Sequence, residues 1–314
     1  MTWKQPDSML KTKIPCSSVY ECAKTVLSTT VLSRSHANHQ HQDRNNMNTW
    51  RLIPLETNNA FLNMAIDEAI LQSRMNNLVP NTLRLYQWRP SAVSIGKNQK
   101  PTDTLYVDNC RKLGVDIVRR NSGGGTVFHD QKGEVTYSVT AETRDLGKDI
   151  PAVYTCIYAA VTDALRLLGI PADYSPGNLK NCPNLTVNTR KISGSAQTVK
   201  RNIIQQHGTL LLSVDLSLMF QLLRVKGINN CGMAAQIAER KITSVQTELG
   251  HAVTAETAAN ALTQGFKAIL KINLNPTGLT LYEQAQAKKL YNSKYATKGW
   301  NQNAETNLSS PNAT

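Results

Sequence analysis

Short strand-like runs and longer helical patterns alternate along the chain from Trp50 onward. The run 134–140 shows the strand pattern clearly, because valine and tyrosine alternate with threonine and serine, which predicts a half-buried strand. Leu210, Leu212 and Val214 likewise share one face of a predicted strand. The predicted strands are, in chain order, residues 49–55, 82–88, 92–96, 115–120, 126–129, 134–140, 185–189, 191–199 and 203–214, so the glycines at 123–125 are predicted to lie between two strands.

Segments with helical periodicity separate these strands. Thr57 or Asn58 offers an N-cap for the first helix, which continues to about Arg74. The predicted helices are residues 57–74, 104–114, 152–168, 216–225, 254–271 and 280–294. Because the strands arrive in consecutive groups with short connections, they predict an α/β (α+β) fold with a mixed, largely antiparallel sheet flanked by helices.

The composition divides the chain into three parts. Residues 1–46 are rich in His, Ser, Thr and Asn and poor in acids, which predicts a disordered N-terminal extension. An organellar transit peptide is an alternative, as is an upstream extension of a mis-assigned reading frame with Met47 as the true start. The predicted domain covers residues 47–300, and residues 301–314 are predicted to be a disordered tail.

The net charge favours an anionic partner. The 314 residues include 35 Lys and Arg against 22 Asp and Glu, which gives +13. The basic residues form no run of five, so a nucleic acid is not the expected partner. With 40% hydrophobic residues the chain can form a substantial core.

The cysteines indicate the compartment. All six are far apart and none forms a C-x-x-C pair, which predicts reduced thiols in a cytoplasmic protein and no disulfide framework or zinc site. No apolar run reaches the ~18 residues of a membrane span, so no membrane partner is expected. The His cluster "HANHQH" is interpreted as part of a solvated tail rather than as a metal site.

The stretch "RRNSGGGTVFHD", residues 119–130, places two arginines shortly before three consecutive glycines. Each glycine costs roughly 1 kcal/mol relative to Ala in ordered structure, so the run calls for an explanation. Glycines let backbone N–H groups approach an anion, and guanidinium groups bind carboxylates or phosphates in a fork geometry. A hairpin turn with exposed arginines explains this stretch equally well, and it matches neither the P-loop nor the dinucleotide-binding pattern.

A second stretch, "RKISGSAQTVKRNIIQQHGTLLL", places Lys191 between strand-like pieces, three residues before Gly194. A single lysine is usually a solvated surface charge. The combination of the two stretches, in this order and spacing, is what makes Lys191 a candidate.

Five stretches occur in the order "NMAIDEAIL", "WRPSAVSIGKNQ", "RRNSGGGTVFHD", "RKISGSAQ" and "QHGTLLLSVDL". In this order they resemble the lipoate-protein ligase family, within the broader group of biotin and lipoate protein ligases and octanoyl transferases. The resemblance covers roughly Trp50 to Trp300 and implies a biotin/lipoate ligase-like catalytic domain. The arginine–glycine run and the Lys-Ile-Ser-Gly run are its most specific parts.

The resemblance implies a two-step ligase. Lipoate or octanoate would react with ATP to give acyl-AMP and pyrophosphate, and a lysine of a lipoyl domain would then take the acyl group. Mg²⁺ is expected with ATP, although the sequence shows no carboxylate cluster to hold it. The implied partners are lipoyl domains of 2-oxoacid dehydrogenase complexes or the glycine cleavage H protein, together with a separate accessory ligase subunit.

The resemblance also assigns site residues. Lys191 matches the catalytic lysine that touches the acyl carbonyl and the α-phosphate, where an ammonium can stabilise developing negative charge. The cofactor-binding positions are Arg119, Arg120, Gly123, Gly124, Gly125, Thr126, Val127, Phe128, His129 and Lys191 itself. His129 also fits the role of a hydrogen-bonded strand residue.

The chain departs from the family pattern near Cys182. Many members have Asn-Asp where this chain has Pro183 and Asn184, which puts that loop position in doubt. Cys182 lies where related octanoyl transferases carry a nucleophilic cysteine, and a nearby lysine favours the thiolate. Its separation from Lys191 is shorter than in those enzymes, so an incidental loop thiol is the competing interpretation.

Three functional hypotheses follow. The main prediction is a lipoate-protein ligase that works with an accessory subunit, because the chain stops near Trp300. The first alternative is an octanoyl transferase that moves octanoyl from acyl carrier protein to lipoyl domains through Cys182 without ATP. The second is a non-catalytic paralogue that senses or binds lipoate, against which the presence of Lys191 argues.

Overall fold

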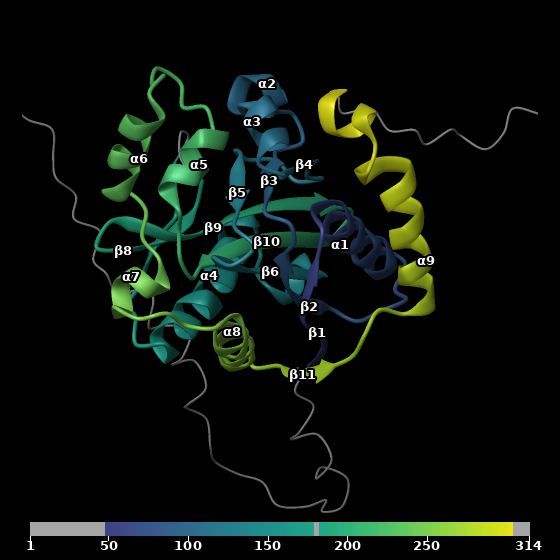
Figure 1. Cartoon of the computed structure of the whole chain (residues 1–314). Helices are drawn as coiled ribbons and strands as arrows, with labels where there is room; N and C mark the ends of the chain where they lie inside the picture. Colours follow the sequence, from purple (N-terminus) through teal and green to yellow (C-terminus); the bar gives the residue numbers. More distant parts are fainter. Residues whose placement is uncertain (1–47, 179–181, 304–314) are drawn as a thin grey trace, which may run out of the picture. The chain divides into compact units, whose positions relative to one another are not determined.

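In the computed structural model, which describes residues 48–178 and 182–303, a mixed eight-stranded sheet forms the centre of the fold (Figure 1). Its strands are, in spatial order, β11 (Asn273–Pro276), β1 (Thr49–Asn58), β2 (Thr82–Trp88), β6 (Glu134–Glu142), β10 (Ile203–Leu211), β9 (Arg190–Lys200), β8 (Asn184–Val187) and β7 (Asp173–Ser175). The pairs that β1 makes with β11 and β2 are parallel, and the other five pairs are antiparallel. The predicted fold class, a mixed and largely antiparallel sheet flanked by helices, is confirmed.

A smaller three-stranded sheet carries the glycine run. Its strands lie in the order β4 (Asp116–Arg119), β3 (Ala92–Ile95) and β5 (Val127–His129). Because β3 is parallel to β4 and antiparallel to β5, residues 120–126 connect the two edges of this sheet. Both ends of the glycine run are therefore anchored in one sheet.

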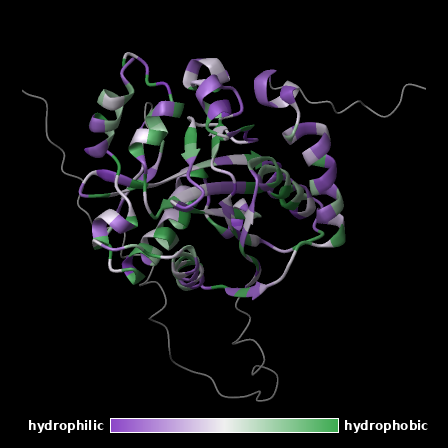
Figure 2. Cartoon of the chain, viewed as in Figure 1, coloured by the Kyte–Doolittle hydropathy of each residue, from purple (hydrophilic) through white to green (hydrophobic). Residues whose placement is uncertain are grey.

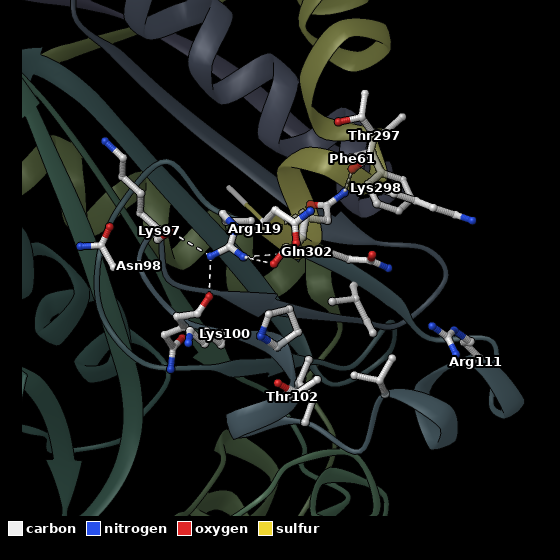
Figure 3. A pocket seen from close by; sticks show the side chains of 18 of the residues that line it. Phe61, Lys97, Asn98, Lys100, Thr102, Arg111, Arg119, Thr297, Lys298 and Gln302 are labelled. Carbon is white, nitrogen blue, oxygen red and sulfur yellow. Dashed lines mark hydrogen bonds between the residues drawn. The ribbon is translucent and has the colours of Figure 1, made fainter. Parts of the chain in front are cut away.

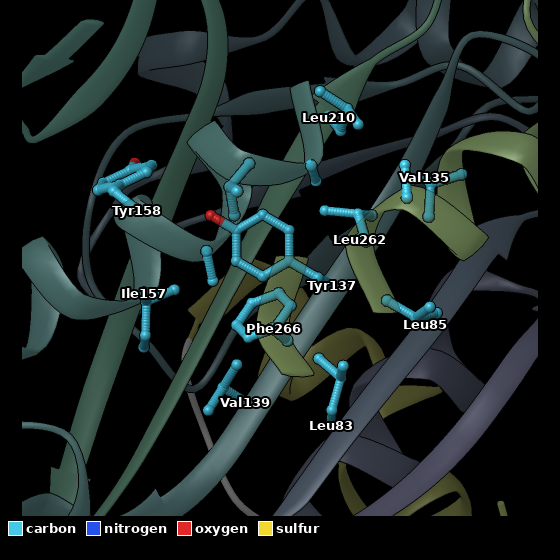
Figure 4. Close-up of a cluster of buried hydrophobic side chains, with 14 of the residues drawn as sticks. Leu83, Leu85, Val135, Tyr137, Val139, Ile157, Tyr158, Leu210, Leu262 and Phe266 are labelled. Carbon is cyan, nitrogen blue, oxygen red and sulfur yellow. The ribbon is translucent and has the colours of Figure 1, made fainter. Parts of the chain in front are cut away.

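Helices cover both faces of the large sheet. The helices are α1 (Ala60–Met75), α2 (Pro101–Thr104), α3 (Val107–Lys112), α4 (Ile150–Leu167), α5 (Leu216–Leu222), α6 (Cys231–Glu239), α7 (Val245–Leu249), α8 (Ala255–Leu270) and α9 (Leu281–Leu290), with short turns η2 (Thr143–Asp145), η3 (Tyr291–Tyr295) and η4 (Gly299–Asn303). On one face α4 and α8 approach closely at Gly265, where a Cβ would lie 2.3 Å from the carbonyl oxygen of Ala160. Figure 4 shows the core beneath them, in which the rings of Tyr137 and Phe266 are 5.9 Å apart.

The opposite face of β6 is polar, yet it is buried as well. Thr136, Ser138 and Thr140 are only 1–2% exposed. Helix α1 packs on this side and brings Asp67, whose carboxylate accepts a hydrogen bond of 2.8 Å from Arg84 of β2. The prediction of a half-buried strand is therefore wrong, because the polar side chains lie under α1, where buried hydroxyl, carboxylate and guanidinium groups satisfy one another.

Several element boundaries differ from the prediction. Helix α3 begins at Val107 rather than at Thr104, because residues 101–104 form the separate short helix α2. Helices α6 and α7 and the short strands β7 and β11 had no counterpart in the prediction. These elements have few residues, and their weak periodicity gives little local signal.

The C-terminal segment is ordered as far as Asn303, three residues beyond the predicted domain boundary. Asn301 is 8% exposed, and its side-chain amide donates to the carbonyl of Tyr295 at 2.7 Å. Figure 2 shows that α9 is largely hydrophilic, and its buried Glu283 pairs with Arg51 of β1 at 2.6 Å. The predictions for residues 1–46 and 304–314 lie outside the described residues. No helix in the described part of the chain has the length and apolar character that crossing a bilayer requires.

Candidate active site

A cavity of about 570 Å³, called the central cavity below, is lined by the small sheet and by β8, β9 and β10. Its size falls in the range of small-molecule sites. Eight of the predicted site residues line it: Arg120, Gly124, Gly125, Thr126, Val127, His129, Cys182 and Lys191. Of the other predicted residues, Phe128 is 3% exposed in a hydrophobic cluster, Gly123 lies in the loop beside the cavity, and Arg119 lies elsewhere.

The three glycines of the loop differ in whether the protein itself requires a glycine at their position. Gly124 has a φ of +90°, which favours glycine, and its carbonyl oxygen packs so tightly on Gly96 that a Cβ there would lie 2.1 Å away. A Cβ on Gly123 or Gly125 would meet no protein atom within 4 Å. The protein itself therefore does not require their lack of side chains, and this open space suits the approach of a bound molecule.

Arg120 holds the glycine loop in place. It is 4% exposed, and its guanidinium donates to the carbonyls of Gly123 and Gly125, both at 2.9 Å. The same group donates to the carbonyl and hydroxyl of Ser94 at 2.9 and 2.8 Å, and its Nε lies 3.4 Å from the hydroxyl of Ser122. All five N–H groups are used within the protein, so the side chain keeps its charge but offers no free donor.

Arg119 points away from the central cavity. Its guanidinium donates to the carbonyls of Lys97 and Gln99 at 2.9 and 2.6 Å. It also donates to the carbonyls of Trp300 and Asn301 in the C-terminal segment, at 2.8 and 3.1 Å. The adjacent arginines therefore stabilise different parts of the protein. Arg120 fixes the glycine loop, and Arg119 connects the C-terminal segment to the loop after β3.

His129 lies at the centre of a buried hydrogen-bond chain. Its Nδ1 is 2.7 Å from the Glu134 carboxylate, which can only accept, so this nitrogen carries the hydrogen. Its Nε2 then accepts from the hydroxyl of Ser94 at 2.7 Å. Trp88 stacks on the imidazole with ring centroids 3.9 Å apart. This chain of hydrogen bonds ends at Arg120, because the Ser94 hydroxyl also accepts a hydrogen bond from the Arg120 guanidinium.

His207 of β10 is a cavity residue that the sequence analysis did not single out. Its Nε2 lies 2.8 Å from the hydroxyl of Ser122, and its Nδ1 lies 3.4 Å from the carboxylate of Asp67. Burial lowers the pKa of this histidine, although Asp67 acts in the opposite direction. The available signal was a histidine within a strand of otherwise buried residues in the "QHG" stretch.

Lys191 stands beside a β-bulge. Leu185 pairs with Ser193 but Thr186 pairs with Lys191, so Ile192 is an extra residue that changes the direction of β9. A Cβ on Gly194 would lie 2.5 Å from the Lys191 Nζ, so the ammonium rests directly on this glycine.

The backbone of Lys191 is fixed on its other side. Its N–H donates to the carbonyl of Lys241 at 2.8 Å, and its carbonyl accepts from Thr243 at 2.9 Å. Burial of the ammonium lowers the pKa of Lys191, and the charge of the neighbouring Cys182 acts in the opposite direction. Among the described residues, the Lys191 Nζ has no hydrogen bond and no ion-pair partner, which leaves this cation available.

Cys182 lies at the start of β8 with an exposed side chain. The chain next to it is held by Tyr158, whose hydroxyl donates to the carbonyl of Pro183 at 2.9 Å. Burial lowers the pKa of Arg120 to about 10, and electrostatic interactions with Tyr86 and, more weakly, with Cys182 act in the opposite direction. Cys182 therefore lines the same cavity as the cations of Arg120 and Lys191, and a cation nearby favours an anion.

The lining of the central cavity does not suit a magnesium nucleotide. Its described residues include no carboxylate, and the described chain contains no group of three His, Cys, Asp or Glu arranged to hold a metal ion. Mg²⁺ is usually held by carboxylates together with phosphate oxygens. The cavity does offer apolar surface from Met64, Trp88, Val127 and Ala196, which suits an acyl chain.

Comparison with known proteins gives a family. Residues 59–267 match the model of the lipoyl protein ligase A/B catalytic domain. The chain belongs to this family. The octanoyltransferase LipM of Brevibacillus brevis is 32% identical over 81% of this chain and 99% of its own length. The corresponding enzyme of Symbiobacterium thermophilum is 34% identical over 80% and 97%.

Solved structures share the fold. A bipartite lipoate protein ligase from Thermoplasma acidophilum, studied with its E2 lipoyl domain, superimposes with a TM-score of 0.70. It is 26% identical and covers 85% of this chain and all of its own. A lipoate-protein ligase A bound with ATP gives a TM-score of 0.69 at 27% identity, covering 81% and 98%. The predicted family resemblance is confirmed.

The comparisons correct the predicted activity. The main prediction was a ligase that activates lipoate with ATP, and it is contradicted, because relatives at 30–34% identity over most of the chain are octanoyltransferases. The names of these relatives agree with the first alternative given in the sequence analysis, an octanoyl transferase. The chain is an enzyme of the lipoate ligase and octanoyltransferase family.

Proposed function

We propose that this enzyme moves an octanoyl group from a thioester donor to a lysine of a lipoyl domain, through Cys182 and without ATP. The observation that carries the proposal is the position of Cys182, which shares the central cavity with the cations of Lys191 and Arg120. The names of the octanoyltransferase relatives support the reaction class. The lipoyl domain studied with a structural neighbour supports the class of acceptor.

In the first step the Cys182 thiolate attacks the donor carbonyl carbon. A bond forms between this carbon and Cys182 Sγ, the carbonyl becomes an oxyanion, and the bond to the donor sulfur then breaks. The donor leaves as a thiolate that takes a proton from water. The free ammonium of Lys191 stabilises the oxyanion, because a cation aimed at developing charge lowers the barrier.

In the second step the acceptor amine attacks the acyl-enzyme. The neutral ε-amine of the acceptor lysine forms an amide bond with the octanoyl carbon and loses one proton to solvent. The Cys182 sulfur leaves as a thiolate, so the enzyme returns to its starting state. Arg120 contributes charge through its fixed position but no hydrogen bond to substrate, since its N–H groups are already used.

The test follows both steps separately with a small octanoyl thioester, the apo lipoyl domain and the full chain. Intact-mass measurement should show octanoyl on wild-type protein and on Cys110→Ser, a matched control at a buried thiol. Cys182→Ser should form no thioester and should lose at least about 10³-fold in transfer, as expected for removal of a nucleophile. Transfer that survives in Cys182→Ser, or that requires MgATP, would overturn the proposal.

A further inference from the structure

A second cavity, called the basic groove below, adjoins the central cavity and has a volume of about 1190 Å³. Its walls come from the loop after β3, from α3, from the end of α5 and from the C-terminal segment. Six basic residues line it, namely Lys97, Lys100, Arg111, Arg119, Arg224 and Lys298. Asp108 is the one acidic residue among the described residues of its lining.

Three of these six cations, the lysines, are available to a partner. Arg111 pairs with Asp108 at 2.9 Å on the exposed rim, and Arg224 lies over the ring of Tyr106 at 4.7 Å. The three lysines of the groove have no carboxylate partner within the described chain, and all three are exposed. Figure 3 shows Lys97 and Lys100 on one side of Arg119, with Lys298 on the other.

The floor of the groove is rigid. Arg119 is 2% exposed, and its guanidinium joins the carbonyls of the loop after β3 to those of the C-terminal segment. The exposed lysines on both sides therefore project from segments that one buried side chain holds together. A preorganised arrangement of this kind reduces the entropy that a partner must overcome on binding.

The basic groove and the central cavity share a thin wall. The side-chain oxygen of Gln99, which lines the groove, accepts from the N–H of Gly96 at 2.8 Å and from the hydroxyl of Thr126 at 3.2 Å. Thr126 lines the central cavity. A negative group bound in the groove is therefore next to the place where the acyl group is exchanged.

The central cavity has too few available cations to neutralise the charges of a strongly anionic donor. Its arginine has no free N–H, which leaves Lys191 as the available cation among its described residues, and this ammonium is assigned to the reacting centre. Acyl thioesters of carrier proteins are attached through a phosphodiester-bearing arm to an acidic domain. The charges of such a donor need a second, separate set of cations.

We propose that the basic groove binds the phosphodiester and the adjoining acidic surface of the carrier protein that donates the octanoyl group. This inference rests on the proposed function, because it assumes a carrier-bound thioester. A phosphate fits the concave part of the groove, and carboxylates of the carrier meet the exposed lysines at its rim. The acceptor lysine bears no phosphate, so the lipoyl domain is expected to dock elsewhere.

The test reverses the groove charge in the triple variant Lys97→Glu, Lys100→Glu and Lys298→Glu. The matched control reverses three exposed lysines outside the groove, Lys148, Lys267 and Lys288, in the same way. A milder variant, Lys97→Gln with Lys298→Gln, guards against misfolding of the triple. Each protein is acylated at Cys182 by octanoyl carrier protein and, separately, by octanoyl-N-acetylcysteamine, which has no phosphate and no protein.

The groove triple should lower kcat/KM for the carrier donor by about tenfold or more, and the milder variant by a smaller factor. Raising the salt from about 50 to about 500 mM should slow acylation of wild type and control, because salt screens the attraction between the groove and the carrier protein. The triple variant lacks this attraction, so its rate should not change. Acylation by the small thioester should be unchanged in all proteins. An equal loss in the control, a loss with both donors, or a loss confined to the transfer onto the lipoyl domain would overturn the proposal.

Binding separates this inference from the proposed function. Titration calorimetry of the carrier protein with the full-length Cys182→Ser variant reports docking without any chemistry. Tight binding that the groove triple abolishes supports the groove even if Cys182 proves not to be the nucleophile. Binding that the triple leaves intact refutes the groove even if acyl transfer through Cys182 is demonstrated.

Discussion

The two walls of the central cavity are built differently. The wall that carries the glycine loop is closed upon itself, since Arg120 uses every N–H group on Ser94, Ser122 and the loop carbonyls. The wall formed by β8 and β9 exposes Cys182 and leaves the ammonium of Lys191 without a hydrogen-bonding partner among the described residues. The wall with the glycine loop therefore keeps the shape of the cavity and contributes a fixed positive charge. The wall with Cys182 and Lys191 supplies the groups that can react.

This difference separates stability from activity. A side chain with all its hydrogen bonds inside the protein contributes to folding, and its loss leaves buried carbonyls without partners. A charge that makes no hydrogen bond or ion pair within the protein contributes little to folding. Substitutions on the two walls are therefore expected to change different measurements.

Apart from loss of the nucleophile itself, the largest effect is expected on the reactive wall, at Lys191. Lys191→Met should lower the transfer rate by about 10²- to 10³-fold, on the scale of removing one oxyanion-stabilising donor. Its unfolding free energy in urea should stay within about 1 kcal/mol of wild type, since no described hydrogen bond or ion pair of Nζ is lost. The control is Lys241→Met, an exposed lysine near it that should keep full activity. A large loss of stability in Lys191→Met would show that this wall is structural too.

On the closed wall, Arg120→Met should destabilise the fold by about 2–4 kcal/mol, because it leaves the buried carbonyls of Gly123 and Gly125 without donors. Arg166→Met is a suitable comparison, since that arginine is 68% exposed and pairs only with Asp163 three residues earlier. It should change stability by no more than about 0.5 kcal/mol. Equal urea midpoints for the two variants would refute the structural role of Arg120.

The sequence predicted much of the site because the site is carried by local motifs. The glycine run and the Lys191 stretch were placed correctly between strands, and their residues do meet in one cavity. The prediction placed Arg119 in the same pocket as Arg120, but the alternation of side chains along a strand turns the two in opposite directions. The partners of Arg119 in the C-terminal segment, in contrast, lie 181 to 183 residues further along the chain, and no local sequence pattern predicts these contacts.

The choice between ligase and transferase was less predictable. The resemblance was to a broad group that includes both ligases and octanoyl transferases, so the motifs that carried it did not distinguish the two. The proposed transfer depends on Cys182, and a cysteine in a loop has no periodic neighbours that support its assignment from sequence. Its relation to Lys191 and Arg120 depends on how β8, β9 and the small sheet come together, which is a property of the tertiary fold.

A smaller effect is expected from Gly194→Ala, which changes the reactive wall without removing a charge. The added methyl group would lie within 2.5 Å of Lys191 Nζ and would force the ammonium to move. Transfer should fall by about tenfold, since small misplacements of a catalytic group are costly. Gly278→Ala, where a Cβ meets nothing within 4 Å, should leave the rate unchanged. Identical rates for the two variants would mean that Lys191 acts from another position.

The smallest expected effect is a change in the alkaline limb of the pH profile of transfer. Burial lowers the pKa of Lys191 below its ordinary 10.5, so the active ammonium is lost as the pH rises through this lowered value, earlier than for a free lysine. In Lys191→Arg the guanidinium stays charged throughout this range, so the residual activity should persist to higher pH than in wild type. Stopped-flow acylation by the small thioester measures both profiles. An alkaline limb at the same pH in both proteins would assign the titration to another group, and Lys191 would then act through its position rather than through its charge.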